Sequence, residues 1–444
     1  MPPAPPIPQR PNVAPYHYHT YNYLVPAPGP FAPSAAIPGR GQFYSLVEDL
    51  EALRQNGLIR HVPNITVGPV PGGAQTAGLR NTLMVSFGNV TGAANRPTVV
   101  FTGGIHAREW IAAEFAYLLA EYLIGNYPIG APANPRVALL KHLVDNRNIR
   151  IIPMLNPDGN DRTVYGAVPA DRMWRKNTRQ LPGTPAAWQL ALAPAVPPFR
   201  NVHGLPPSAD YEAPDFDPAH HIPPNILAAN YRQQVLGNNE TGVDGNRNMA
   251  TPGWGFDSGP AYNGKDPHQD TYFGTSAGGE PENANLQLAM AAPPPGGWLG
   301  NIAVSIDYHS YGRMILYPDE MPAGGPDADY QRTGLLMRAL IRNNVGGGQY
   351  ALGGVGVGYL STGTIDSYSA QAHQARAFTI ELDPSGLLGN AGFALPEIHI
   401  QAVFEKNIRG ALAALAAPDG LPAAQAIRNT LALWAVHGAG NQVP

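Results

Sequence analysis

Short apolar runs alternate along this chain with stretches in which apolar residues recur every three or four positions. The runs are typical of buried strands, and the 3.6-residue spacing is typical of helices. The pattern predicts strands at residues 82–87, 98–102, 149–155, 302–308 and 377–382. It predicts helices at residues 43–57, 107–124, 330–344, 397–416 and 423–435. Because strands alternate with helices, we expect an α/β fold: a single domain with a mixed, largely parallel twisted sheet covered by helices on both faces.

Proline interrupts this pattern in two places. Residues 1–42 carry twelve prolines, and residues 178–242 carry eleven with little periodicity. Since proline fixes φ and lacks an N–H donor, we expect residues 1–42 to form an extended arm. The folded domain is then expected over residues 43–444, with an insertion at about 178–242. Within the arm, His17 and His19 alternate with tyrosines, which favours a wrapped N-terminal strand over a metal pair.

Composition narrows the classes of function. Lys and Arg number 28 against 32 Asp and Glu, a net charge of −4 that provides no basic surface for nucleic acid. The most apolar long stretch, residues 110–125, is broken by two glutamates and is too short for a membrane span. Cysteine is absent, so a metal would need His, Asp or Glu ligands. The absence of both disulfides and a signal peptide is compatible with a cytoplasmic location.

Candidate metal ligands follow two of the predicted strands. His106 and Glu109 come soon after the strand at 98–102, and His309 directly follows the strand at 302–308. Ligands in α/β sheets bind at the carboxyl ends of strands, and catalytic zinc usually has three protein ligands and one open position. An acid at a helix N-terminus would also explain Glu109, and a core histidine would explain His309. The spacing alone therefore leaves both interpretations open.

Seven motifs together resemble one family, the zinc metallocarboxypeptidases of the carboxypeptidase A type. They occur in the order found in that family and span roughly residues 43–417. The motifs are His106-Ala-Arg108-Glu109-Trp110, Asn156-Pro-Asp-Gly159, Arg172-Met-Trp-Arg175-Lys176, Gly242-Val-Asp-Gly-Asn246-Arg247-Asn248, Glu280-Pro-Glu282, His309-Ser-Tyr311 and Phe378-Thr-Ile-Glu381-Leu382.

The resemblance implies a zinc-dependent hydrolase with one zinc ion per chain. His106, Glu109 and His309 match the zinc ligands. Glu381 matches the general base, and Arg175 matches the residue that stabilises the oxyanion. These side chains suit the chemistry, because three N/O ligands leave zinc able to acidify water and polarise a carbonyl.

The same resemblance implies residues that bind the substrate, the C-terminus of a peptide or protein. Asn246 and Arg247 match the groups that bind its free carboxylate, a task suited to the planar fork of arginine. Arg108 is expected to add positive charge on the substrate side. Tyr359 matches a mobile tyrosine that covers bound substrate, although its spacing to Asp366 departs from the usual pattern by about one residue.

The resemblance also implies that specificity follows from the residue just before Asp366 in the stretch Gly-Thr-x-Asp, which in this family lies at the base of the side-chain pocket. This residue is Ile365, which implies a preference for large apolar or aromatic C-terminal residues. Glu320 is the alternative, because it could place a carboxylate in the same pocket. A second function is also open, a zinc amidohydrolase that acts on cell-wall peptides or acylated amino acids.

Overall fold

The computed structural model of the chain describes most of the predicted domain. The part outside the described residues includes the first fifteen residues, residues 180–241 of the expected insertion at about 178–242, Tyr359 and the helix expected at 423–435. The described residues are 16–22, 32–37, 40–88, 96–166, 169–179, 242–255, 270–291, 302–321, 328–341, 350–353, 361–385 and 389–420.

The elements alternate as the hydrophobic pattern predicts. The strands are β1 (Tyr18–Thr20), β2 (Phe43–Ser45), β3 (Thr66–Pro69), β4 (Leu83–Gly88), β5 (Thr98–Gly103), β6 (Asn148–Ile152), β7 (Ile302–Ser310), β8 (Met314–Leu316), β9 (Ala351–Gly353) and β10 (Arg376–Leu382). The α-helices are α1 (Leu46–Ile59), α2 (Trp110–Gly125), α3 (Pro135–Asp145), α4 (Pro157–Tyr165), α8 (Pro281–Ala291), α9 (Ala328–Leu340), α10 (Ile365–His373) and α11 (Ile400–Ala416). Short 3-10 turns are η1 (Pro169–Met173), η2 (Gly245–Arg247), η3 (Gly389–Phe393), η4 (Glu397–His399) and η5 (Ala417–Asp419).

Eight of these strands form one mixed sheet, as expected. Its order is β3-β4-β6-β5-β7-β10-β8-β9. The four central strands β6, β5, β7 and β10 are parallel to one another, whereas β4 and β8 join them antiparallel. The central strands β5 and β6 are buried at every position, as is typical of parallel strands that are covered on both faces.

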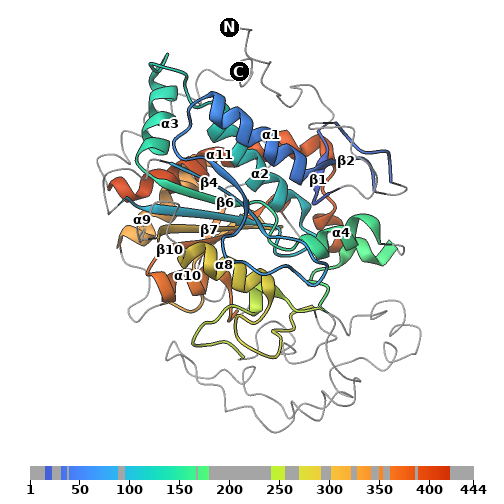
Figure 1. The fold of residues 1–444 in the computed structure, drawn as a ribbon. Coiled ribbons are helices and arrows are strands. Elements are labelled where there is room, and N and C mark those ends of the chain that lie inside the picture. Colours follow the sequence, from blue (N-terminus) through green and yellow to red (C-terminus); the bar gives the residue numbers. More distant parts are fainter. Residues whose placement is uncertain are drawn as a thin grey trace, which may run out of the picture.

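Helices cover both faces of this sheet, which confirms the expected architecture (Figure 1). Helix α2 lies on β5 and β7 and is flanked by α1 and α11, so nearly its whole length is buried. Helices α8 and α10 lie on the opposite face in the view of Figure 1. Among the described residues, no helix is both long enough and apolar enough to cross a bilayer.

The first two predicted helices begin later than the hydrophobic pattern indicates. The helix expected from residue 43 starts at Leu46, because Phe43–Ser45 pairs as a strand and the Ser45 hydroxyl accepts a hydrogen bond from Glu48 N, 3.4 Å away. The helix expected from residue 107 starts at Trp110, with Glu109 as its N-cap. Glu109 makes no side-chain capping bond, so its carboxylate is available for other contacts.

The wrapped strand expected near His17 and His19 is present, and it joins the core. Strand β1 pairs in parallel with β2, and Tyr18 is buried in the main apolar cluster. His19 Nδ1 lies 2.8 Å from Glu114 Oε2 of α2, and its Nε2 lies 3.1 Å from Asp49 Oδ2 of α1. Burial alone would lower the pKa of His19, but these two carboxylates raise it to about 9.

Candidate active site

The three candidate metal ligands are brought together at the carboxyl ends of adjacent strands. His106 follows β5, and His309 lies near the end of β7, which pairs with β5. Gly103, the last residue of β5, and Gly104, which follows it, allow a close approach to α2. A Cβ on Gly103 would lie 2.5 Å from the Ala112 carbonyl oxygen, and Gly104 has φ +66°. The glycines therefore bring the first turn of α2, and with it Glu109, against the strand end.

His106, Glu109 and His309 converge on one point. One ligand atom from each lies within 4.8 Å of the others, and all three residues are buried. The Nδ1 atoms of the two histidines are 3.0 Å apart, and Glu109 oxygens lie 2.8 Å from His106 Nδ1 and 3.1 Å from His309 Nδ1. Two imidazole lone pairs and a carboxylate that face one another suit a bound cation. The set is also the two-His, one-Glu set of catalytic zinc sites, so these residues fit zinc.

Asp244 and Arg175 support the first histidine. Asp244 Oδ1 lies 3.2 Å from His106 Nε2, and its Oδ2 accepts hydrogen bonds from Arg175 Nε and Nη2 at 3.0 and 2.9 Å. Burial would raise the pKa of Asp244, but Arg175 and His106 hold it well below its usual range. Arg175 is thereby fixed with its Nη1 3.8 Å from Glu109 Oε1, at the edge of the metal site.

Glu381 lies beside the ligands on the next strand. In the register of β10 against β7, Glu381 is directly opposite His309. Burial raises the pKa of Glu381 to about 8, against the opposing effects of His309 and Arg175. Its Oε2 is buried without a hydrogen-bond partner within the described part of the chain. An unpaired carboxylate oxygen of raised basicity can accept a proton from a neighbouring group.

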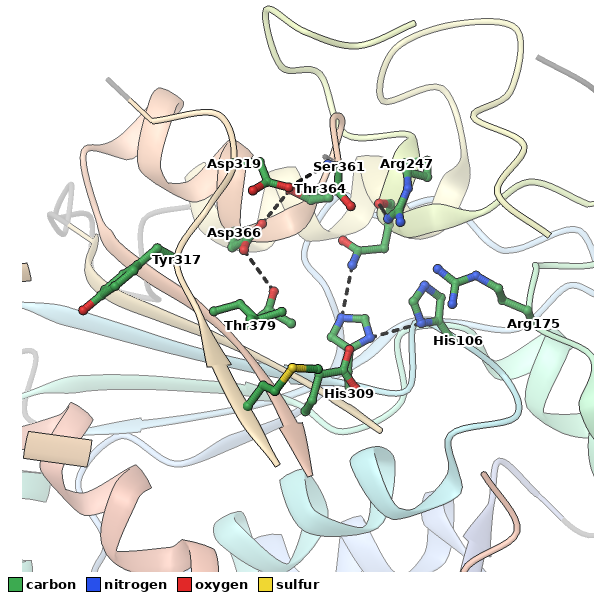
Figure 2. Close-up of a pocket in the computed structure, with 14 residues that line it drawn as sticks. His106, Arg175, Arg247, His309, Tyr317, Asp319, Ser361, Thr364, Asp366 and Thr379 are labelled. Carbon is green, nitrogen blue, oxygen red and sulfur yellow. Dashed lines mark hydrogen bonds between the residues drawn. The ribbon is translucent and has the colours of Figure 1, made fainter. Parts of the chain in front are cut away.

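A cavity of about 140 Å³ opens beside these residues (Figure 2). Asn246 and Arg247, from the turn η2, lie on its wall. The Oδ1 atom of Asn246 accepts a hydrogen bond from Ile365 N at 2.9 Å, and Arg247 Nη1 donates to the Asn246 carbonyl at 2.7 Å. The lining consists of His106, Arg175, Asn246, Arg247, His309, Met314, Leu316, Tyr317, Asp319, Ser361, Thr364, Asp366, Thr379 and Glu381.

Arg108 does not belong to the lining of this cavity. Its Nη1 lies 2.9 Å from Asp270 Oδ2, and its guanidinium stacks over Phe393 at 4.2 Å from the ring centre. The expected role of Arg108 in charging the substrate side is therefore not supported by its position. Tyr359 lies outside the described residues.

Ile365 and Glu320, the two residues considered for specificity, both face away from the cavity. Ile365 is fully buried in an apolar cluster that includes Met249 and Leu286. Ile365 does not line the cavity, because α10 begins at Ile365 and the side chain packs in the core. Glu320 is buried and accepts hydrogen bonds from Thr251 Oγ1, Gly253 N and Gly363 N at 2.6 to 2.8 Å, so it is neither solvated nor in the pocket.

Two aspartates, Asp319 and Asp366, line the cavity, whereas the sequence analysis considered their neighbours Glu320 and Ile365. Asp366 accepts hydrogen bonds from Thr364 Oγ1 and Thr379 Oγ1, and Asp319 accepts one from Ser361 N at 2.6 Å. Burial raises the pKa of both, that of Asp319 to about 7. The end of the cavity away from the histidines is thus acidic (Figure 2).

Sequence reasoning missed four acids at this site. Asp244 stands two residues before Asn246, within one of the seven motifs. Asp307 stands two residues before His309, so the two side chains lie on the same face of a strand. That alternation was a usable signal for Asp307. Asp319 and Asp366 carry no local signal, because only the fold brings their segments to the cavity.

Comparison with known proteins gives one consistent result. The family model described as zinc carboxypeptidase matches residues 73–410. Carboxypeptidase B from Astacus astacus is 26% identical over 324 residues, covering 72% of this chain and 80% of that protein. Metallocarboxypeptidase A from Trichophyton tonsurans is 25% identical over 331 residues, covering 73% of this chain and 60% of that protein.

Solved structures agree at the level of the fold. Carboxypeptidase A from Helicoverpa armigera has a TM-score of 0.56 and 21% identity, covering 88% of this chain and 77% of the other. Thrombin-activatable fibrinolysis inhibitor has a TM-score of 0.56 and 19% identity, covering 87% and 75%.

Proposed function

Since the chain belongs to the zinc carboxypeptidase (M14) family, we propose that it is an exopeptidase that hydrolyses the C-terminal peptide bond of peptides or proteins. One observation carries this proposal: Asn246 and Arg247 line the same cavity as the metal-ligand residues His106 and His309. An enzyme that removes C-terminal residues must bind a free carboxylate next to its reacting group, and an arginine with a neighbouring amide does this by paired hydrogen bonds.

We further propose how the residues around the cavity share the reaction. His106, Glu109 and His309 would hold zinc. When bound, zinc would act as a Lewis acid that polarises the scissile carbonyl and lowers the pKa of a water molecule. Glu381 would accept a proton from this water on its carboxylate and return it to the leaving amine. Arg175 would stabilise the negative charge that develops on the carbonyl oxygen, because Asp244 holds its guanidinium in place before the reaction.

The side chain of the departing residue would enter the acidic end of the cavity. The sequence predicted a large apolar or aromatic residue there, on the basis of Ile365. The cavity instead supports a basic residue, because Asp319 and Asp366 line it and Ile365 does not. A cation that reached these two carboxylates would be paired with them, whereas an apolar side chain would make no ion pair there. Tyr359 stays in the proposal as the residue that covers bound substrate.

The alternative, hydrolysis of amides in cell-wall peptides or acylated amino acids, is not favoured by the site. It would predict that Asn246 and Arg247 point away from the metal ligands. Asn246 Nδ2 instead lies 3.2 Å from His309 Nε2, and Arg247 lines the same cavity (Figure 2).

A panel of N-blocked dipeptides that differ only in the last residue tests the proposal. We expect hydrolysis that is lost with a zinc chelator and regained with added zinc. We also expect kcat/KM to be at least about tenfold higher for C-terminal Arg or Lys than for Leu, Phe or Glu. A tenfold ratio corresponds to about 1.4 kcal/mol, and we expect the binding free energy of one paired buried charge to exceed this value. A clear preference for Leu or Phe would restore the apolar prediction, and hydrolysis of none of the panel would reject the exopeptidase.

A further inference from the structure

Asp307 is a buried carboxylate that the reaction described above does not use. It lies on β7 two residues before His309, so both side chains project from the same face of the strand. Its Oδ2 is 2.5 Å from His309 Nε2, and its Oδ1 accepts a hydrogen bond from Thr102 Oγ1 at 2.6 Å. Asp307 is only 1% exposed. A carboxylate at this depth needs partners, and both of its oxygens have one.

The geometry decides where the proton of His309 lies. His309 turns its Nδ1 toward Glu109 and toward Nδ1 of His106, so Nδ1 is the atom that faces the metal position. A neutral imidazole that ligates through Nδ1 carries its hydrogen on Nε2 and must donate it there.

Two side chains come within reach of His309 Nε2, and one of them can accept. Asn246 presents its Nδ2 at 3.2 Å, because its Oδ1 is already bonded to Ile365 N. An amide nitrogen has no free lone pair, so it cannot accept the hydrogen. Asp307 Oδ2 can accept it, at 2.5 Å. Asn246 Nδ2 then keeps its own hydrogens for the cavity.

Both imidazoles of the metal site are therefore supported in the same way. His106 presents Nδ1 to the metal position and Nε2 to Asp244, and His309 does the same with Asp307. The two carboxylates differ in one respect. Asp244 is neutralised by Arg175, whereas within the described residues no Arg or Lys forms an ion pair with Asp307. The negative charge of Asp307 acts on its histidine without that compensation.

We propose that Asp307 is a positioning residue of the metal site. It holds His309 in the tautomer and ring orientation that ligate through Nδ1, and its charge makes that nitrogen a stronger ligand. Loss of such a partner typically weakens metal binding by about 10- to 100-fold. The proposal rests on the zinc site and is independent of which substrate the enzyme cleaves.

Zinc affinity, measured without substrate, tests this proposal. Zinc dissociation constants of wild type, Asp307→Asn and Asp307→Ala are determined at one pH by competition with a chromophoric chelator, and the Tm of each metal-free protein is recorded. We expect affinity to fall in the order wild type, Asn, Ala, because asparagine can still accept from Nε2 but lacks the charge. The loss should be about tenfold for Asn and approach 100-fold for Ala.

Thr102→Val is the matched control, since it removes the other hydrogen bond of Asp307 and leaves His309 its partner. We expect its zinc dissociation constant to stay within about threefold of wild type, because His309 keeps its carboxylate. If Asp307→Ala does not fold, the near-isosteric Asp307→Asn decides the question. An Asp307→Asn dissociation constant within twofold of wild type overturns the proposal. So does a loss of affinity in Thr102→Val equal to that in Asp307→Asn, because packing would then explain both.

Discussion

Replacing both His19 and Glu114 by glutamine should remove a pH-dependent part of the stability of this protein. His19 is buried between Glu114 and Asp49, so it keeps its proton in the native state to a higher pH than in the unfolded chain. A rise of its pKa from 6.5 to about 9 corresponds to about 3 kcal/mol, since each pKa unit is worth about 1.4 kcal/mol. The double variant replaces His19 and its partner Glu114 by two neutral amides.

The direction of the effect follows from proton linkage. Below about pH 6.5 both states of the protein hold the proton and the full contribution is present. As the pH rises through about 9, the native histidine loses its proton as well and the contribution disappears. Other groups titrate in this range, so the informative quantity is the difference between wild type and the double variant.

Urea unfolding of the metal-free proteins, followed by tryptophan fluorescence at pH 6 and pH 9.5, measures this difference. Zinc is left out because it would stabilise the native state by mass action. Between pH 6 and pH 9.5, the free energy of unfolding should fall by about 3 kcal/mol more in wild type than in the double variant. Equal losses in both proteins would show that His19 does not carry the charge that its two carboxylates imply.

Three further predictions concern the active site. His309→Ala should lose both bound zinc and peptidase activity, as measured by metal analysis and peptide hydrolysis, and retention of stoichiometric zinc would contradict the ligand assignment. Glu381→Gln should keep zinc and fold but lose about 10²- to 10⁴-fold in kcat, because an amide cannot accept the proton; near-normal turnover would assign the base elsewhere. Asp366→Asn should lower kcat/KM for C-terminal Arg by about 100-fold or more and change it little for Leu, because it removes one buried partner of the cation; equal effects on both substrates would argue against an acidic pocket.

Much of the fold could be predicted because the central strands are buried on both faces. Strands β5, β7 and β10 appear in the sequence as apolar runs, and their carboxyl ends carry His106, His309 and Glu381. The short strands at the sheet edges and the helices α3, α4, α8 and α10 were not predicted. Three-residue strands such as β8 and β9 are too short for any periodicity to show.

The residues that line the pocket could not be predicted, because a difference of one position in the sequence decides which side chain lines it. Ile365 and Asp366 are adjacent, and the start of α10 decides which of them faces the cavity. Thr364 caps that helix by accepting a hydrogen bond from Ser367 N, which directs Ile365 inward.

The partners of His19 were beyond sequence reasoning for a different reason. Alternation of His and Tyr was enough to predict the strand β1. Asp49 and Glu114 lie on α1 and α2, and only the packing of those helices brings both carboxylates to one imidazole. Contacts of this kind depend on tertiary structure and leave no local pattern.

One measurement tests the central claim most directly. Two peptides of a single sequence that ends in arginine, one with a free C-terminal carboxylate and one with a C-terminal amide, are incubated with the zinc-loaded protein and analysed by mass spectrometry. The proposed exopeptidase should remove the last residue from the free peptide and leave the amidated peptide intact, because we propose that Asn246 and Arg247 bind the free carboxylate. It should lose this activity when zinc is chelated. Equal cleavage of both peptides, or cleavage at internal bonds, would contradict it.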